Sequence, residues 1–234
     1  MSDTFAIELK GVTKVFGQIV ANKDVNLQVK KGEILAILGE NGSGKTTLMN
    51  MLSGIYFPDE GQIFVNGEEV VIKSPKDAFK YGIGMVHQHF MLVPNLTVAE
   101  NMVLGMEPKH KGMFMDYKKA VEITEEYAKK YNLHVDPNAK VRDIPVGMKQ
   151  KVEILKALVR GAKILILDEP TASLNESDSK ALLELLLQFK RQGMTSIIIS
   201  HKLNEISYVA DKITVIRDGS TIETLDKKKD DFSE

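Results

Sequence analysis

Apolar positions along the chain follow two different patterns. Residues 5–9 and 25–29 nearly alternate apolar with polar side chains, as strands do when one face is buried. Residues 34–38, 164–167 and 197–199 are apolar at every position, which is typical of strands covered on both faces in a parallel sheet. The sequence therefore predicts half-buried strands near the N-terminus and a parallel sheet flanked by helices.

Helical patterns precede two of the apolar runs. Residues 152–159 lead into the run at 164–167, and residues 181–189 lead into the run at 197–199. A helix followed by a buried strand, repeated twice, indicates parallel α/β architecture.

Three further segments complete the expected fold. Residues 61–67 have the pattern of a strand that ends in an Asn-Gly turn, and residues 213–223 that of an antiparallel hairpin around Asp218-Gly219. Between about residues 90 and 160 no run resembles a buried strand, and the apolar side chains of residues 120–131 have helical spacing. We therefore expect an α/β fold with a helical insertion.

Length, charge and cysteine content exclude several classes of protein. The 234 residues suffice for one substantial domain, and the formal charge of −1 argues against a nucleic-acid partner or a polybasic membrane anchor. The absence of cysteine excludes disulfides, thiolate metal sites and a cysteine nucleophile. No apolar run approaches the roughly 20 residues of a spanning helix, and the first residues lack the pattern of a signal peptide. We therefore expect a soluble chain in the cytoplasm.

A glycine-rich phosphate-binding motif follows the apolar run at 34–38. The P-loop pattern G-x-x-x-x-G-K-[ST] is formed by Gly39, Glu40, Asn41, Gly42, Ser43, Gly44, Lys45 and Thr46. Glycines let the backbone turn its N–H groups toward phosphate oxygens, and a helix opening near Thr47 adds its positive N-terminal end. Lys45 is suited to reach the β- and γ-phosphates, and the Thr46 hydroxyl to ligate Mg²⁺. A strand, a loop and a helix in this order favour a nucleotide site over a plain surface turn.

The motif alone does not decide the reaction. A GTPase would carry Asn-Lys-x-Asp downstream, whereas residues 22–25 lie upstream and lack the final Asp. We therefore set guanine specificity aside, and the P-loop leaves an ATPase and a small-molecule kinase open.

Two carboxylates end the apolar run at 164–167. Ligands bind at strand ends in open α/β sheets, and side chains alternate across a strand, so Asp168 and Glu169 need not share an environment. Asp168 is suited to hold Mg²⁺, and Glu169 to orient and deprotonate an attacking water.

With these motifs the chain resembles the ATP-binding cassette (ABC) ATPases over essentially its whole length. Five further features occupy the family's positions: the adenine-stacking Phe16, the Q-loop Gln88, the signature segment 144–150, the D-loop residues 172–175 and the switch His201. The resemblance implies a P-loop NTPase (RecA-like) core with an N-terminal antiparallel β subdomain, formed by about residues 1–88 and 161–234. It places a helical subdomain that carries the signature at about residues 89–160.

The resemblance also implies ATP as the nucleotide and a division of roles in the site. Thr46, Gln88 and Asp168 would hold Mg²⁺, while Glu169, His201, Gln88 and Lys45 would act in hydrolysis. The signature residues would contact ATP held by a second ABC domain; here they are Pro145, Val146, Gly147 and Met148. The D-loop residues are Ser173, Leu174 and Asn175.

Two departures from the family pattern concern what this chain offers to its partner. Pro145 stands where the family has serine, so a hydroxyl donor is lost, and Asn175 stands where the family has Asp. A catalytically weak or regulatory domain is therefore the alternative interpretation. His87 and His89 have the i, i+2 spacing of metal ligands on one strand face, but Gln88 between them explains this segment better.

Residues 85–101 and 146–158 resemble the importers for simple sugars and nucleosides, most of all the nucleoside branch. In that branch the ATPase polypeptide usually has two such domains, and this chain is most similar to the first. We expect it to be part of a longer polypeptide rather than a single-domain subunit. The resemblance implies a second ABC domain, transmembrane permease subunits and indirectly an extracytoplasmic solute-binding protein as partners, and a peripheral location on the cytoplasmic side of the membrane. A non-transport ABC ATPase is the more remote alternative.

Overall fold

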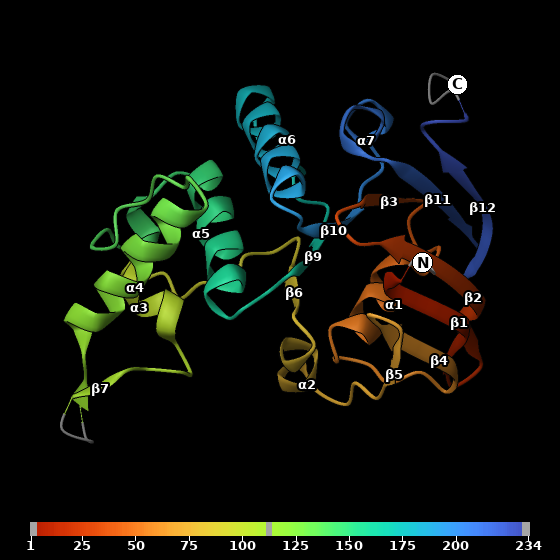
Figure 1. Ribbon diagram of the computed structural model, residues 1–234, viewed down its shortest axis with the longest axis horizontal. Helices are drawn as coiled ribbons and strands as arrows, with labels where there is room; N and C mark the ends of the chain where they lie inside the picture. The colour runs from red at the N-terminus through yellow and green to blue at the C-terminus, as the bar shows by residue number, and fades with distance from the viewer. Residues whose placement is uncertain (1–3, 111–113, 231–234) are drawn as a thin grey trace.

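A computed structural model describes residues 4–110 and 114–230, and its strands form two main sheets (Figure 1). The first sheet has the order β2-β1-β4-β5 and is antiparallel throughout. Its strands are β1 (Phe5–Phe16), β2 (Ile19–Lys30), β4 (Glu60–Val65) and β5 (Glu68–Val70). The predicted N-terminal β subdomain is confirmed. β1 and β2 are longer than the pattern predicted because register shifts between Leu9 and Val15 interrupt the alternation.

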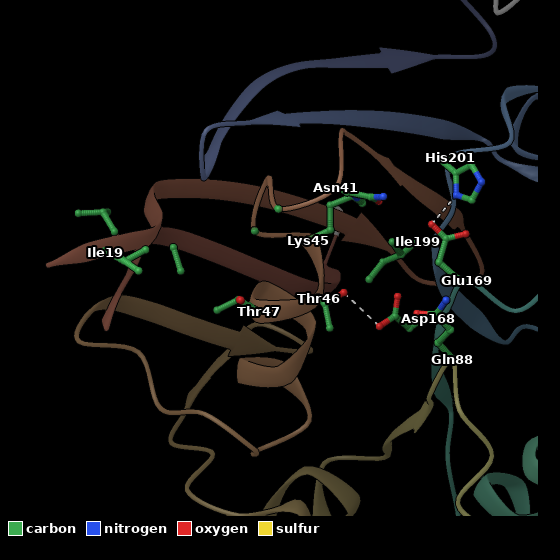
Figure 2. Close-up of a pocket in the computed structure, with 14 residues that line it drawn as sticks. Ile19, Asn41, Lys45, Thr46, Thr47, Gln88, Asp168, Glu169, Ile199 and His201 are labelled. Carbon is green, nitrogen blue, oxygen red and sulfur yellow. Dashed lines mark hydrogen bonds and ion pairs between the residues drawn. The ribbon is translucent and has the colours of Figure 1, made fainter. Parts of the chain in front are cut away.

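The second sheet has the order β12-β11-β3-β10-β9-β6 and is parallel except for the β11–β12 hairpin. Its strands are β3 (Ile34–Leu38), β6 (Ile83–Val86), β9 (Ile164–Asp168), β10 (Thr195–Ile199), β11 (Lys212–Arg217) and β12 (Ser220–Asp226). The three all-apolar runs thus form strands of a parallel sheet, as predicted, and the structure shows that they are neighbours at its centre. Their carboxyl ends meet at the edge of the sheet where the phosphate loop lies (Figure 2).

Strand β6 was not predicted from the hydrophobic pattern, because Gly84 interrupts its short apolar run. A Cβ atom at Gly84 would lie 2.8 Å from the Cβ of Ala162 and 3.1 Å from that of Ala157. Glycine is therefore required for the close packing of β6 beneath α5, and this requirement leaves no mark in a hydrophobic pattern.

Helices cover the sheets and form a separate group at one side (Figure 1). Those on the core are α1 (Lys45–Leu52), α2 (Pro75–Lys80), α6 (Glu176–Arg191) and α7 (Leu203–Val209). The group at the side comprises α3 (Val98–Val103), α4 (Tyr117–Lys130), the short 3₁₀ turn Val141–Asp143 and α5 (Val146–Val159). This group confirms the helical insertion, to which the structure adds a two-residue pairing of β7 (Lys109–His110) with β8 (Phe114–Met115). Within residues 4–110 and 114–230, no helix has the length and apolar character needed to cross a membrane.

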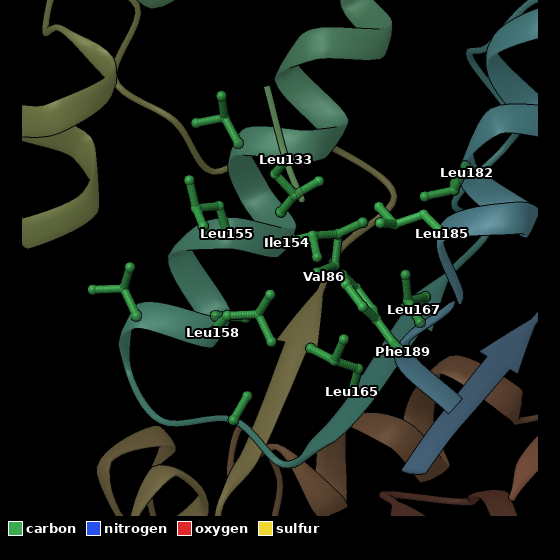
Figure 3. Close-up of a cluster of buried hydrophobic side chains, with 14 of the residues drawn as sticks. Val86, Leu133, Ile154, Leu155, Leu158, Leu165, Leu167, Leu182, Leu185 and Phe189 are labelled. Carbon is green, nitrogen blue, oxygen red and sulfur yellow. The ribbon is translucent and has the colours of Figure 1, made fainter. Parts of the chain in front are cut away.

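One large apolar cluster joins the helical group to the parallel sheet (Figure 3). Leu165 and Leu167 of β9, Leu155 and Leu158 of α5, and Phe189 of α6 are buried in it. The Phe189 ring is fully buried and meets the Tyr131 ring edge to face at 5.7 Å between centroids. This packing fixes α5 and α6 relative to the strand that ends in the acidic pair.

Phe189→Ala is expected to lower the free energy of unfolding by about 3–5 kcal/mol, because it removes a buried ring and leaves a cavity that the surroundings only partly fill. Urea unfolding followed by circular dichroism measures the loss. Ile222→Ala on β12 is the control, since Ile222 is 61% exposed and its truncation should change stability little. Equal losses in both variants would contradict the assignment of Phe189 to the core.

Candidate nucleotide site

A cavity of about 480 Å³ opens at the carboxyl edge of the parallel sheet (Figure 2). It is bounded by the start of β2, the phosphate loop with the start of α1, the segment after β6, and the ends of β9 and β10. Its lining residues are Ile19, Val20, Ala21, Asn41, Gly42, Gly44, Lys45, Thr46, Thr47, Gln88, Asp168, Glu169, Ile199 and His201. The phosphate loop, Gln88, the acidic pair and His201, which are distant along the chain, therefore converge on one site.

The glycines of the phosphate loop are required for two different reasons. Gly42 and Gly44 have φ angles of 82° and 94°, a left-handed conformation that L side chains rarely adopt. Gly39 is needed for close approach instead, because a Cβ atom there would lie 2.4 Å from the carbonyl oxygen of Ile216. The loop thus depends on β11 behind it as well as on its own turns.

Lys45 is buried inside the loop, with 7% of its surface exposed. Its Nζ donates hydrogen bonds to the carbonyl oxygens of Gly39 and Glu40, both at 2.7 Å. Burial lowers the pKa of the Lys45 ammonium, and the negative charges of Glu169 and Asp168 oppose this shift. The cation is therefore held where phosphate oxygens would enter the loop, facing the two acids.

Thr46 and Asp168 form the oxygen-rich part of the site. The Thr46 hydroxyl donates to Oδ2 of Asp168 at 3.2 Å. Burial raises the pKa of the Asp168 carboxyl, and the Thr46 hydrogen bond acts in the opposite direction. Gln88 adds an amide to the same wall of the cavity. A bound cation would offset the cost of burying the Asp168 charge, so these oxygen donors fit a hard cation such as Mg²⁺.

Protein side chains alone do not form a metal cage here. In the two described stretches, no group of three or more His, Cys, Asp or Glu side chains is arranged to hold a metal ion. Mg²⁺ typically binds through one or two protein groups together with waters and substrate phosphates, which agrees with the few donors present. The metal-ligand interpretation of His87 and His89 also fails geometrically, because β6 ends at Val86 and neither histidine belongs to a strand.

Glu169 faces away from Asp168 and toward His201 (Figure 2). Its Oε1 lies 2.9 Å from Nδ1 of His201, whereas its Oε2 is buried and has no hydrogen-bond partner among the described residues. The backbone of Glu169 has a φ of 45°, a left-handed conformation that costs about 1–3 kcal/mol in a residue other than glycine. The two carboxylates thus have separate environments, which strand alternation had left open, and one oxygen of Glu169 has no hydrogen-bond partner among the described residues.

Phe16 lies at the end of β1 and does not line the cavity. Its ring meets the Tyr56 ring edge to face at 5.0 Å between centroids, and 40% of its surface is exposed. The apolar wall of the cavity consists instead of Ile19, Val20 and Ala21 on the paired strand β2. Sequence reasoning missed these three residues. The feature that could have revealed them is the apolar pair Ile19 and Val20, which directly follows the glycine-containing turn between β1 and β2 and is exposed in the structure. Adenine stacking on Phe16 stays a prediction.

The signature residues lie outside the cavity. Pro145 is the N-cap of α5 and makes no side-chain capping hydrogen bond, while Val146, Gly147 and Met148 form the first turn. Gly147 is packed against α6, because a Cβ atom there would lie 2.7 Å from the Asp178 carboxylate. The loss of the hydroxyl donor at Pro145 therefore leaves this helix end with backbone groups alone.

The D-loop residues connect β9 to α6. Ser173 and Leu174 precede Asn175, which caps α6 by accepting a hydrogen bond from the Asp178 N–H at 2.8 Å. The Asn175 amide also donates to Oδ2 of Asp178 at 3.0 Å. A carboxylate at position 175 would instead face the Asp178 carboxylate, so the uncharged side chain suits this neighbour.

The ABC transporter family profile matches residues 22–172, which is more than half of the chain, and the chain belongs to this family. It is 51% identical over 226 residues to the nucleoside import ATP-binding protein NupA of Lactococcus lactis subsp. cremoris (strain MG1363). It is 51% identical over 222 residues to the guanosine import ATP-binding protein NupO of Bacillus subtilis (strain 168), and 48% identical over 232 residues to the L-arabinose transport ATP-binding protein AraG of Geobacillus stearothermophilus.

These alignments cover 97%, 95% and 98% of this chain but 44%, 43% and 45% of the relatives, so the chain spans less than half of their length. Solved ATP-binding cassettes share the fold. The ADP conformation of MJ1267, a cassette of an ABC transporter, matches with a TM-score of 0.85 and 26% identity, covering 96% of this chain and 92% of that one. The dimeric MJ0796 cassette matches with a TM-score of 0.79 and 29% identity, covering 94% and 98%.

Proposed function

We propose that this chain binds and hydrolyses Mg²⁺·ATP and thereby powers an ABC importer for nucleosides or simple sugars. The observation that carries the proposal is the single cavity that joins the phosphate loop, the Thr46–Asp168 pair and the Glu169–His201 pair. The names of the nucleoside and sugar import relatives support the class of transported solute.

We propose a step for each group of the site. The loop N–H groups and the Lys45 ammonium bind the phosphates, and the N-terminal end of α1 favours their negative charge. Glu169 accepts a proton from the attacking water, and His201 holds one oxygen of its carboxylate in place. Mg²⁺ held by Thr46, Asp168 and Gln88 would neutralise charge on the phosphates during transfer.

We further propose that hydrolysis requires a second ABC domain. The signature and D-loop residues lie outside the chain's own cavity, so they are available to the nucleotide of a partner, and a partner's signature would close this one. The dimeric cassette structure and the greater length of the relatives support a pair, formed within one polypeptide or between two copies. ATP that contacts both halves favours the closed pair, and loss of the γ-phosphate favours reopening.

The remaining partners follow from the same proposal. Permease subunits would cross the membrane and this domain would bind them from the cytoplasmic side, with a solute-binding protein acting from the other side. The helical group α3–α5 stands to one side of the core, which gives such a permease a distinct surface to contact (Figure 1).

Pro145 supports a second candidate, a catalytically weak or regulatory domain. Its helix end presents no side-chain donor to a partner's nucleotide. This deficit concerns the partner's site, however, whereas the chain's own cavity contains the phosphate loop, the acidic pair and His201. Hydrolysis by this site is therefore the better supported function.

A reconstituted importer tests the solute class. The polypeptide that contains this chain is assembled with its permease in lipid vesicles, and uptake of labelled nucleosides is compared with uptake of labelled pentoses. ATP-driven nucleoside uptake is the expected result, because the two relatives at 51% identity are named as a nucleoside and a guanosine import protein. Pentose uptake would instead assign the sugar branch, and no uptake of either would contradict the import function.

A further inference from the structure

Three side chains close in sequence to Glu169 and His201 form a hydrogen-bonded network, Thr171, Lys202 and Glu205. The Thr171 hydroxyl donates to Oε2 of Glu205 at 2.5 Å. Lys202 Nζ donates to the carbonyl oxygen of Thr171 at 3.2 Å and approaches the Thr171 hydroxyl oxygen at 3.4 Å. The same Nζ lies 3.2 Å from Oε1 of Glu205. Thr171 is 1% exposed, so its hydroxyl depends on these partners for its hydrogen bonds.

The network ties together the two loops that carry the reacting pair. Thr171 lies two residues after Glu169 in the loop that follows β9. Lys202 directly follows His201 in the loop after β10, and Glu205 lies in the first turn of α7. The Lys202 N–H also donates to the Ser200 hydroxyl at 3.1 Å, which fixes the backbone on both sides of His201. The network therefore fixes the two loops relative to each other. It does so within two residues of Glu169 and His201, whose side chains make the 2.9 Å contact.

Glu169 needs such support because its backbone is strained. Its left-handed φ of 45° is retained only where the surroundings hold it. On one side, the Glu169 N–H donates to the Ile199 carbonyl at 2.9 Å. On the other side, the Glu169 carbonyl accepts from the Ala172 N–H at 3.1 Å. The Ala172–Glu169 hydrogen bond closes a turn that contains Thr171. Through Thr171 this turn is attached to the loop after β10.

None of the three side chains lines the cavity. The Lys202 ammonium is directed to acceptors within the network, so it is not oriented toward a phosphate in the loop. A contribution of these residues to hydrolysis would therefore act through the position of Glu169 and His201.

We propose that Thr171, Lys202 and Glu205 are positioning residues for hydrolysis. Their hydrogen bonds connect the loop after β9 to the loop after β10 and thereby keep Glu169 and His201 in contact. The proposal rests on the proposed ATPase function. It assigns to this network an effect on turnover and none on the binding of ATP, because the phosphate loop is built from other residues.

Thr171→Val is the central test, because it removes the hydroxyl while keeping the shape of the side chain. The expected result is a roughly 10- to 100-fold fall in kcat with an unchanged Kd for ATP, since a misplacement of about 1 Å costs on this order. Thr171→Ser restores the hydroxyl and should recover most of the turnover. Thr171→Val combined with Glu205→Ala should lose less than the product of the two single losses, because both changes break the same network.

Thr195→Val is the matched control. Thr195 is also buried, at 3% exposure, and its hydroxyl accepts from the Gly32 N–H at 2.9 Å, but it begins β10 at the end remote from the cavity. A purely structural role for Thr171 predicts that both valine variants lose thermal stability alike and keep the same kcat. Turnover by Thr171→Val at the wild-type rate, or an equal fall in Thr195→Val, would overturn the proposal.

Amide hydrogen exchange gives a readout that needs no activity. In Thr171→Val, exchange of the Glu169 amide should accelerate while that of Leu165, within β9, stays unchanged. Unchanged exchange at Glu169 would overturn the proposal even if the wild-type chain does not hydrolyse ATP. Absence of turnover in the wild type, with the exchange result as expected, would instead contradict the proposed function alone.

Discussion

Replacing Lys45 with alanine is expected to weaken ATP binding by about 10- to 100-fold, the effect of losing one charged hydrogen-bonding group worth roughly 1.5–3 kcal/mol. Turnover should fall further, to the background, because the ammonium also neutralises charge that develops on the phosphates during transfer. Isothermal titration measures binding, and release of inorganic phosphate measures turnover. Lys45 is the one lysine or arginine among the residues that line the cavity, so no other such cation is placed to replace it there.

Two controls separate the loss of charge from damage to the loop. Lys45→Met keeps most of the aliphatic stem, so it should fill the loop and still lose binding and turnover. Lys129→Ala, at an exposed position near the end of α4, should change neither. Wild-type turnover by either Lys45 variant would remove Lys45 from the site.

Glu169→Gln is expected to retain ATP binding and to lower turnover by about 10²- to 10⁴-fold, the contribution of a general base. Glutamine keeps the size of the side chain and an oxygen toward His201, but it does not accept a proton from water. ATP binding should be retained because the substitution leaves the phosphate loop and Lys45 unchanged. Glu125→Gln, exposed on α4, is the charge-matched control and should turn over at the wild-type rate.

The local motifs of the site could be predicted from sequence because each is continuous along the chain. The phosphate loop needs only a buried strand, positive-φ glycines and a helix start, and all of these are written within residues 34–52. The acidic pair was likewise marked by the end of an apolar run. Strand alternation indicated that Asp168 and Glu169 need not share an environment, and in the structure their neighbours are Thr46 and His201 respectively.

Features that depend on close approach between distant segments left no such pattern. Gly84 is a glycine because α5 and the following turn pack on β6, and it concealed that strand. The cavity wall at Ile19 and Val20 depends on where the β1–β2 hairpin lies above the loop. The Thr171–Glu205 hydrogen bond joins residues 34 positions apart, and neither residue type is unusual in its place.

The departures from the family pattern at Pro145 and Asn175 show the same difference between what the sequence reveals and what only the structure reveals. Sequence alone indicated a lost hydroxyl and a lost charge. The structure shows that Asn175 has a local reason, since its amide bonds to Asp178 at the start of α6. Pro145, at the N-terminus of α5, has no compensating side-chain donor. We therefore expect the partner's site to be affected by Pro145 more than by Asn175.

Phosphate release by the wild-type chain and by Glu169→Gln, with Mg²⁺·ATP and over a range of chain concentrations, tests the central claim most directly. We predict release by the wild type that rises more than linearly with concentration, because a pair is required, and release near the background by Glu169→Gln despite retained ATP binding. Equal rates for the two proteins would contradict the assignment of Glu169 as the base. No release by the wild type, alone or joined to a second ABC domain, would contradict the proposed ATPase itself.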